Sequence, residues 1–215
     1  MSEIYLEILD PKRQSVFDKL AAFDEIGYLA GGTALALQLK HRKSYDFDIF
    51  VNKPLTRQFF HKVTSVLGSQ VKPRVNTADL LLLNTENNIQ VDFVHYWYKL
   101  LQPTIKTSSI QLATIEDIAT DKAHTIGHRG AWRDYVDVFI LLKNKRIQLK
   151  QLIKLAQQKF GSEFAPHLFL QQLTYYKDLP NYAIEFITDS YSDDEIKKFL
   201  IETVKTYHQK EIEKV

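Results

Sequence analysis

The chain has 215 residues, of which 45% are hydrophobic and 25% are charged, with a net charge of +2 and no cysteine. This composition is ordinary for a globular protein, and it excludes extensive disorder, disulfide bonds and thiolate metal sites. No apolar run reaches the roughly 18 to 20 residues of a membrane helix, and the first residues lack a basic and then apolar signal sequence. We therefore expect a cytoplasmic protein with no membrane partner.

Positive charge is unevenly distributed along the chain. The intervals 49–78 and 138–162 contain no acidic residue but several basic ones. These basic residues are Lys53, Arg57, Lys62, Lys72 and Arg74 in the first interval, and Lys143, Lys145, Arg146, Lys150, Lys154 and Lys159 in the second. Such stretches are commonly solvated faces, but beside a nucleotide site they could also guide a polyanion such as RNA.

The first half of the chain predicts helices mixed with strands. Asp10 before Pro11 is typical of a helix start, and Gly68 is typical of a helix end. The expected helices cover residues 11–26, 33–39 and 55–67, and the expected strands cover residues 28–30, 46–51, 71–75, 79–83 and 89–94. The last three strands are separated by short polar turns and should form a meander.

The second half of the chain predicts helices. After a connection over residues 97–109, the expected helices cover residues 114–126, 133–142, 149–160, 163–176 and 192–211. Gly127 and Gly130 predict that the first of these helices frays into a loop. We therefore expect an α/β (α+β) fold with a mixed sheet flanked by helices over residues 1–110, and an α-helical region over residues 111–215.

Two features meet within residues 28–51. A Gly31-Gly32-Thr33 turn follows a short apolar run, and Asp46-Phe47-Asp48 lies in a second apolar run. Side chains two apart in a strand point to the same side, so Asp46 and Asp48 would present two carboxylates together. A bound Mg²⁺ or Mn²⁺ would hold these like charges, because oxygen ligands favour hard cations. The alternative is a solvated Asp-x-Asp on an exposed strand.

The glycine turn favours the metal interpretation. Adjacent glycines let the backbone approach a ligand closely, and a helix starting near Thr33 would point its free N–H groups at an anion. Carboxylates for a metal beside a phosphate cradle are an arrangement for phosphoryl transfer from a nucleoside triphosphate. Arg42 and Ser44 lie between the two features, either on a surface loop or in contact with phosphate or carboxylate groups.

Asp92 is a lone carboxylate in an otherwise apolar strand. It is either an acid at a sheet edge, a third metal ligand, or the base that accepts the proton of an attacking hydroxyl. His124 and His128 have a spacing that could hold zinc. We do not expect zinc, because the chain has no His-Glu-x-x-His motif and Gly127 should interrupt the helix there.

Taken in order, these motifs resemble the AbiEii/AbiGii toxin family, which belongs to the nucleotidyltransferases of the DNA polymerase beta-like superfamily. The resemblance spans about residues 25–145. It rests on Gly31-Gly32-Thr33, His41-Arg42-x-Ser44-x-Asp46-Phe47-Asp48, the strand with Asp92, Asp117-x4-Lys122, Arg129, and Arg133-Asp134-x-x-Asp137. The order and spacing of these motifs are more specific than any one of them alone.

The resemblance implies roles for particular residues in the first part of the chain. Gly31, Gly32 and Thr33 would contact the nucleotide phosphates, and Asp46 and Asp48 would bind the divalent metal. Many members of the superfamily have serine where this chain has Gly32. One hydroxyl ligand to phosphate is therefore missing, which leaves Thr33 or the backbone to replace it.

The resemblance also implies roles for residues further along the chain. Lys122 would be the nucleotide-binding lysine, and Asp134 the downstream catalytic acid, with Asp137 supporting the same motif. Arg42, Lys122 and Arg129 are candidate cations for the leaving pyrophosphate. Alternatively, Arg133 and Asp134 take part in an intrahelical or interhelical ion pair, and whether Asp137 is catalytic or structural is left open.

The activity implied by the resemblance is metal-dependent transfer of a nucleoside monophosphate from a nucleoside triphosphate to an acceptor hydroxyl. The acceptor would be the 3′ end of tRNA or another RNA. The protein would then be the toxin of a type IV-like toxin–antitoxin or phage-abortive-infection system, with a cognate antitoxin as partner. Two alternatives are a protein AMP-transferase and a non-catalytic module that binds nucleotides or partners.

Overall fold

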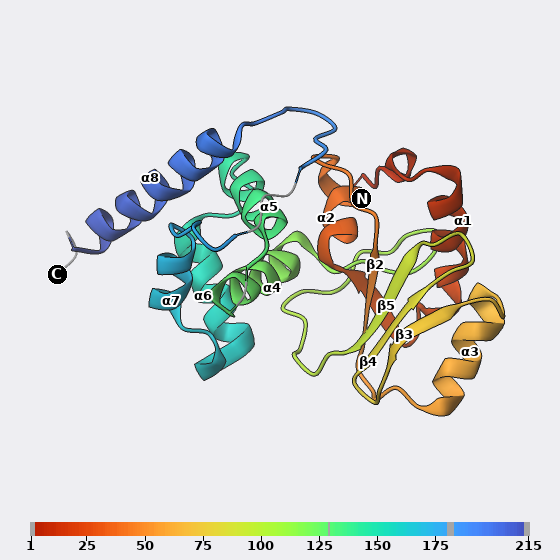
Figure 1. Ribbon diagram of the computed structural model, residues 1–215. Coiled ribbons are helices and arrows are strands. Elements are labelled where there is room, and N and C mark those ends of the chain that lie inside the picture. The colour runs from red at the N-terminus through yellow and green to blue at the C-terminus, as the bar shows by residue number, and fades with distance from the viewer. Residues whose placement is uncertain (1–2, 129, 180–182, 213–215) are drawn as a thin grey trace. The chain divides into compact units, whose positions relative to one another are not determined.

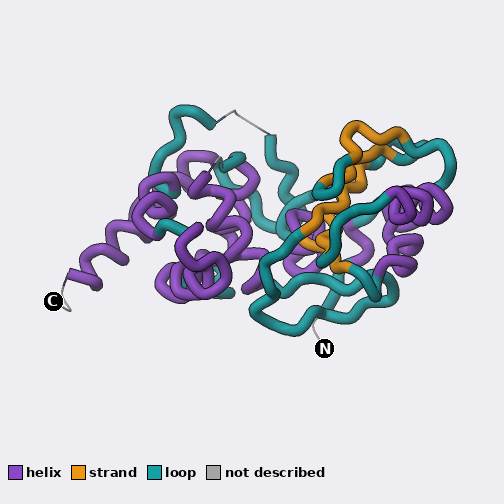
Figure 2. The backbone as a smooth tube through the Cα atoms, turned by 90° about the horizontal axis from the view of Figure 1, so that it is seen from below, coloured by secondary structure: helices purple, strands orange, loops and turns teal. Residues whose placement is uncertain are grey.

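The computed structural model describes residues 3–128, 130–179 and 183–212. The chain divides into two compact units, Met1–Thr114 and Ile115–Val215. All strands belong to the first unit, and every named element of the second unit is a helix (Figures 1 and 2). The expected mixed sheet with flanking helices and a helical C-terminal region is confirmed. Within the described ranges, the helices are too short or too polar to cross a membrane.

One five-stranded sheet organises the first unit, with the strand order β1-β2-β5-β4-β3. Its strands are β1 (Gly27–Ala30), β2 (Phe47–Val51), β3 (Lys72–Asn76), β4 (Leu80–Asn84) and β5 (Gln90–His95). β2 and β5 run parallel, while the other neighbouring pairs run antiparallel. The parallel register pairs Asp48 with Asp92, so two strands that are distant in sequence bring two carboxylates to adjacent positions.

The core of the first unit lies on one side of this sheet, where α1 (Pro11–Lys19) and α3 (Arg57–Leu67) lie together (Figure 1). Phe93 of β5 is fully buried, and its ring centroid is 5.0 Å from that of Phe23 and 5.1 Å from that of Phe59 in α3. Alternate residues of a strand point to the side of the sheet that carries the core, so the residues of β2 are alternately buried and half-buried.

The first helix is shorter than the sequence predicts. Asp10 caps α1 by accepting hydrogen bonds from the backbone N–H groups of Lys12 and Arg13, but the α-helix ends at Lys19. The chain continues as a 3₁₀ turn, η2 (Leu20–Phe23). In a 3₁₀ turn residues three apart share one side, so the tighter winding buries both Leu20 and Phe23 in the core.

Helix α2 (Gly31–Leu39) follows β1 directly and is almost wholly buried. It starts two residues earlier than predicted, at the first glycine of the turn. Lys40, in the left-handed conformation, ends it. The remaining regular element of the first unit is a short 3₁₀ turn, η1 (Leu6–Ile8).

The helices of the second unit are α4 (Ile115–His128), α5 (Trp132–Lys143), α6 (Leu149–Phe160), α7 (Pro166–Gln172) and α8 (Asp193–Ile212), with a 3₁₀ turn η3 (Gly161–Glu163) after α6. The helix predicted at 163–176 is shorter, because the chain first turns through η3 and α7 then begins at Pro166. The capping box of Ser192 and Glu195 is formed at the start of α8.

The predicted end of the helix at residues 114–126 is borne out to within two residues, since α4 ends at His128 and Gly130 lies outside it, but Gly127 itself does not interrupt the helix. Glycine in a helix interior costs about 1 kcal/mol relative to alanine. α4 packs against α5, α6 and α7, and this packing outweighs so small a local preference.

Candidate active site

Two carboxylates occupy paired positions on the sheet of the first unit, and a third lies just before one of these strands. Asp48 and Asp92 are paired residues of β2 and β5, and Asp46 immediately precedes β2. Burial raises the pKa of the Asp92 carboxyl above its ordinary value, and the nearby charge of Asp46 raises it further. A hydrogen bond of 2.7 Å from Gln90 and the guanidinium of Arg74, 3.5 Å from Asp92 Oδ1, act in the opposite direction.

These carboxylates have the chemistry of a magnesium site. Asp92 Oδ1 is buried and accepts no hydrogen bond. Among the described residues, no three His, Asp or Glu side chains lie close enough together to enclose a metal ion. Mg²⁺ is usually held by one or two carboxylates, with water and substrate phosphates completing its octahedron. Asp46 and Asp48 fit that mode of binding, and the role of Asp92 as a third ligand stays a prediction.

The start of α2 lies against one of these carboxylates. Gly31 has a φ of 64°, and an ideal β-carbon built on it would lie 2.2 Å from Asp48 Oδ2. The residue before the helix, Ala30, has no side chain that could cap the first N–H groups of α2. Uncapped helix N-termini bind anions, so the turn has the properties expected of a phosphate cradle.

Arg42 and Ser44 surround the second glycine of the turn. An ideal β-carbon on Gly32 would lie 2.8 Å from Arg42 Nη2 and 3.0 Å from Ser44 Oγ. These two side chains therefore fill the space that a serine side chain at position 32 would need. Arg42 is only 4% exposed, so it does not lie on a solvated surface loop. Its Nη1 donates a 2.9 Å hydrogen bond to the carbonyl oxygen of Lys43.

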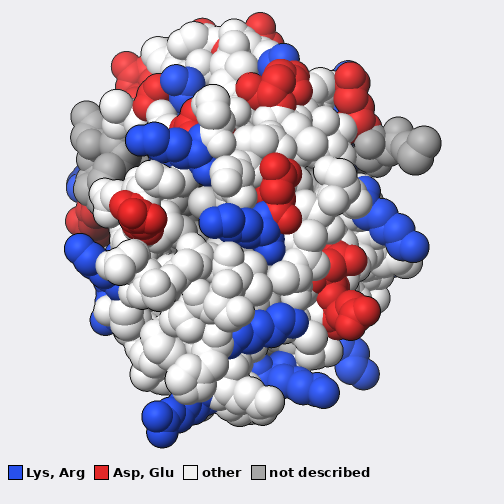
Figure 3. All heavy atoms as spheres, turned by 90° about the vertical axis from the view of Figure 1, so that its right-hand side faces the viewer, with Lys and Arg blue, Asp and Glu red and all other residues white. Residues whose placement is uncertain are grey.

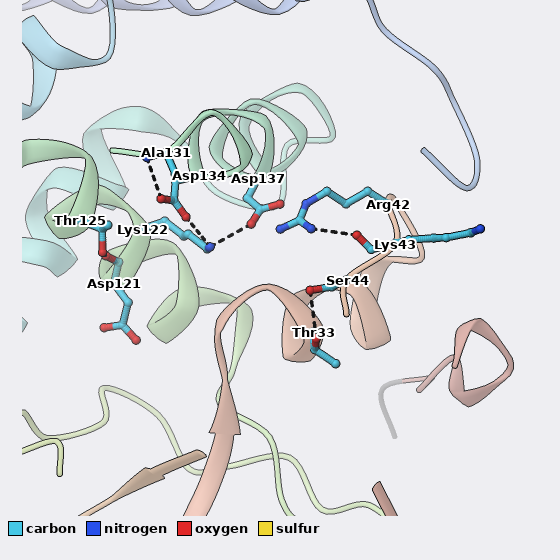
Figure 4. Close-up of polar contacts among 10 residues, drawn as sticks. All are labelled: Thr33, Arg42, Lys43, Ser44, Asp121, Lys122, Thr125, Ala131, Asp134 and Asp137. Carbon is cyan, nitrogen blue, oxygen red and sulfur yellow. Dashed lines mark hydrogen bonds and ion pairs between the residues drawn. The ribbon is translucent and has the colours of Figure 1, made fainter. Parts of the chain in front are cut away.

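Thr33 ties the start of α2 to the residues before β2. Its hydroxyl lies 2.9 Å from Ser44 Oγ (Figure 4). The same hydroxyl donates to the backbone carbonyl oxygen of Asp46. These hydrogen bonds fix the position of the glycine turn relative to the Asp-x-Asp segment. The hydroxyl of Thr33 is thus engaged within the protein, which leaves its backbone N–H as the group suited to a phosphate oxygen.

The second unit holds a buried ion cluster. Lys122 Nζ of α4 lies 2.6 Å from Asp134 Oδ1 and 3.1 Å from Asp137 Oδ2, both on α5 (Figure 4). The two aspartates are three residues apart, so they share one side of the helix. Asp134 Oδ2 also accepts a 3.1 Å hydrogen bond from the backbone N–H of Ala131 at the start of α5. The cluster explains the spacing of the lysine and aspartate motifs in the sequence.

The alternative of an interhelical ion pair is borne out for Asp134, which pairs with Lys122 of α4. Asp134 is buried, whereas Arg133 is exposed. Arg129, the remaining predicted phosphate contact, lies outside the described residues.

Sequence reasoning missed a second buried ion cluster. Lys159 of α6 lies 3.0 Å from Asp117 Oδ1 and 2.7 Å from Asp121 Oδ1, and the side chains of Lys159 and Asp117 are fully buried. Lys159 was expected in a solvated basic stretch, and that expectation is wrong. Asp117 and Asp121 are four apart on one helix, which is the signal that could have indicated a shared cation.

Basic side chains do not form one continuous patch in the view of Figure 3. On this face, Lys and Arg side chains lie among uncharged and acidic residues. Attraction of a polyanion by this face alone therefore has little support from the described surface.

His124 and His128 lie together on α4, with ring centroids 4.5 Å apart. The helix is not interrupted at Gly127, so that argument against zinc is wrong. His124 also stacks on Phe160, with centroids 4.1 Å apart. Within the described ranges, no third His, Asp or Glu joins the two histidines in a metal-binding group.

A mixed sheet with two carboxylates beside a glycine turn at a helix start is the arrangement of a nucleotidyltransferase. Solved structures share this fold. The nucleotidyltransferase toxin MenT4 from Mycobacterium tuberculosis H37Rv aligns with a TM-score of 0.65 and 13% identity, covering 95% of this chain and 84% of that chain. JHP933 from Helicobacter pylori aligns with a TM-score of 0.59 and 16% identity, covering 94% of both chains. At these identities the likeness shows the fold alone.

The sequence itself places the chain in a family. Residues 16–205 match the family described as nucleotidyl transferase AbiEii toxin, type IV TA system. An uncharacterized protein from Aquifex aeolicus (strain VF5) is 32% identical over 185 residues, which covers 84% of this chain and 87% of that protein. The chain belongs to the AbiEii nucleotidyltransferase toxin family and is a transferase enzyme, so the resemblance predicted from the sequence is confirmed.

Proposed function

We propose that this enzyme transfers a nucleoside monophosphate from a nucleoside triphosphate to a hydroxyl at the 3′ end of tRNA or another RNA. It would act as the toxin of a type IV-like toxin–antitoxin or phage-abortive-infection system and be neutralised by a cognate antitoxin. The observation that supports this most directly is the close approach of the Gly31 turn to Asp48, because phosphates bound at the turn would then lie beside a carboxylate that could hold the metal.

In this reaction the acceptor hydroxyl oxygen attacks the α-phosphorus of the nucleotide. The bond from the α-phosphorus to its bridging oxygen breaks, and pyrophosphate leaves with the electron pair. Mg²⁺ or Mn²⁺ held by Asp46 and Asp48 would neutralise charge on the phosphate oxygens. The hydroxyl proton needs a base, and Asp92 is the candidate, since burial favours the protonated form that would result.

Cations are needed for the leaving pyrophosphate. Arg42, held beside Gly32, is the candidate in the first unit. In the second unit Lys122 is the candidate, and Asp134 and Asp137 hold its ammonium group in one position. We propose that residues 1–110 act as the nucleotidyltransferase core and that residues 111–215 complete the catalytic machinery through Lys122 and Asp134.

The test is incubation of the protein with labelled nucleoside triphosphates, Mg²⁺ and total tRNA. Asp46→Asn and Asp48→Asn keep side-chain volume but remove the charges, and each should reduce transfer by at least about 100-fold. Asp18→Asn is the matched control, because Asp18 is exposed on α1. Undiminished labelling by Asp46→Asn would overturn the assignment. Labelling of protein acceptors in place of RNA would favour the AMP-transferase alternative, and nucleotide binding without transfer to any acceptor would favour the non-catalytic one.

A further inference from the structure

The sheet face that carries Asp48 and Asp92 also carries a row of aromatic side chains. Strand residues two apart share a face, so Phe50 lies on the same side of the sheet as Asp48. Across the strands, Phe50 is paired with Tyr28 of β1 and with Val94 of β5. This second row is therefore displaced from the carboxylates by two residues, or about 7 Å along the strands.

The row extends past the end of β5. The backbone N–H of Tyr96 donates a 2.8 Å hydrogen bond to the carbonyl oxygen of Val51, which continues the pairing of β5 with β2. The Tyr96 ring stacks on Phe50, with centroids 4.2 Å apart and an interplanar angle of 29°. Tyr28 meets Phe50 edge-on at 5.9 Å, and Tyr98 meets Tyr96 at 5.3 Å. Four rings from three segments thus form one contiguous surface.

These rings differ from the aromatic residues on the opposite face of the sheet. Phe23 and Phe93, which form the core there, are fully buried. Phe50 and Tyr96 are only half-buried, and Trp97, with its ring 5.5 Å from Tyr98, is 65% exposed. Single exposed apolar residues are common on protein surfaces, but partly exposed rings in mutual contact offer a continuous platform for a ligand.

We propose that the aromatic row of Tyr28, Phe50, Tyr96 and Tyr98, with Trp97 at its end, binds the unpaired nucleotides at the 3′ end of the acceptor RNA. This proposal rests on the proposed function, and it identifies the acceptor half of the same site. Proteins hold unstacked bases on aromatic faces, and they do so without requiring a particular sequence. The row begins next to the carboxylates, where the terminal hydroxyl must lie for the reaction.

Charge beside the row fits RNA better than an apolar protein segment. Arg74 of β3 reaches past β4 to within 3.5 Å of Asp92, and its side chain remains 48% exposed. Lys99 is exposed and directly follows Tyr98. Cations along an aromatic row supply phosphate contacts to a strand whose bases stack on the rings.

The test replaces aromatic rings with an aliphatic side chain, which stays apolar but cannot stack on a base. Phe50→Leu and Tyr96→Leu should each raise the KM for acceptor RNA by about 5- to 150-fold, the change that corresponds to roughly 1–3 kcal/mol of base stacking. The KM for the nucleoside triphosphate should stay unchanged. Phe60→Leu, a half-buried aromatic residue on α3, is the matched control and should leave the KM for RNA unaltered.

Binding measured without catalysis separates this proposal from the proposed function. A fluorescent single-stranded RNA of six nucleotides should bind wild-type protein more tightly than the Leu variants and more tightly than a blunt duplex does. If wild type labels no RNA but this difference persists, the proposed transfer fails and the aromatic row stands. If the wild type labels RNA and the Leu variants keep its KM for RNA, the row is overturned.

Trp97→Leu is a second variant that should fold even if Phe50→Leu does not, because the exposed Trp97 side chain contributes little to the core. A weaker oligonucleotide interaction in that variant would support the row even if Phe50→Leu did not fold. Unchanged binding of the six-nucleotide RNA by Trp97→Leu, Phe50→Leu and Tyr96→Leu would overturn the proposal.

Discussion

The carboxylate of Asp48 occupies the space that a side chain on Gly31 would need, since a β-carbon there would lie 2.2 Å from Asp48 Oδ2. Gly31 also has a φ of 64°, a backbone conformation that residues with a side chain rarely adopt. Glycine is therefore required twice at this position, once for backbone conformation and once for the approach of a carboxylate to the helix start.

Gly31→Ala should reduce nucleotide transfer by about 100-fold or more, because displacement of a catalytic group by about 1 Å is enough for such a loss. The control is Gly161→Ala, since Gly161 has a similar φ of 57° but open space where the β-carbon would lie. That variant should lose about 1–2 kcal/mol of unfolding free energy for the backbone conformation and keep its activity. Urea unfolding and initial rates measure the two effects. Wild-type transfer by Gly31→Ala would show that the position of Asp48 does not matter.

Gly32→Ala should behave differently, because its β-carbon would meet the movable ends of Arg42 and Ser44. We expect a loss of about 1 kcal/mol or less in stability and an increase in the KM for the nucleoside triphosphate as Arg42 is displaced. In an Arg42→Met background the same alanine should have little further effect on that KM. Equal KM increases in both backgrounds would mean that the glycine acts independently of Arg42.

Much of this half of the site can be predicted from sequence, because its signals are local. The glycine turn, the Asp-x-Asp spacing and the capping residues each depend on a few neighbouring positions. The pairing of Asp48 with Asp92 is different, since it requires β2 and β5 to run parallel after a crossover through α3, β3 and β4. A single sequence contains alternation within a strand but not the order of strands in a sheet.

The second unit shows the same limit. Lys122, Asp134 and Asp137 are recognisable as a motif, but Lys159 is not, because its partner Asp117 is 42 residues away on another helix. The surrounding interval contains only basic charges, which suggested a solvated face. Gly127 likewise predicted an interruption of α4 from a local preference that tertiary packing overrides.

Lys122→Met should destabilise the protein by about 3–5 kcal/mol, because it leaves the carboxylates of Asp134 and Asp137 buried without their cation. Adding Asp137→Asn should recover part of this loss, so that the double variant is more stable than the sum of the single effects predicts. Lys205→Met is the control, since Lys205 pairs with Glu202 on the surface with both side chains more than half exposed. Its urea midpoint should be unchanged within error. An additive double variant would show that Lys122 and Asp137 are not coupled.

Lys159→Met separates a structural lysine from a catalytic one. It should cost a similar free energy of unfolding, because Lys159 is buried between Asp117 and Asp121. Both variants should be assayed at a temperature where they remain folded. Lys159→Met should keep the wild-type KM for the nucleoside triphosphate, whereas Lys122→Met should raise this KM by 10-fold or more. A 10-fold increase corresponds to the loss of about 1.4 kcal/mol of binding free energy from the phosphate contact. Equal KM values for the two variants would remove Lys122 from the list of nucleotide contacts.

The last prediction concerns pH and His124. Burial lowers the pKa of this imidazole below its ordinary value, and the positive charges of His128 and Lys159 lower it further, while Glu163 acts against them. The unfolded chain therefore binds a proton at His124 at a higher pH than the folded chain does. The free energy of unfolding rises with pH wherever the unfolded state holds more protons than the folded state. The contribution of His124 to the free energy of unfolding is therefore constant above about pH 7.5 and declines as the pH falls through about 6.5.

His124→Gln should remove this part of the pH dependence. Urea unfolding between pH 5.5 and 8 should show a smaller decline in stability toward pH 5.5 for the variant than for wild type, because this range brackets the ordinary pKa of histidine. At pH 8 the variant should be the less stable protein, because it loses the stacking of His124 on Phe160. His208→Gln, which replaces an exposed histidine of α8, should follow the wild-type curve. Parallel curves for wild type and His124→Gln would show that the imidazole of His124 takes up its proton equally well in the folded and unfolded chain.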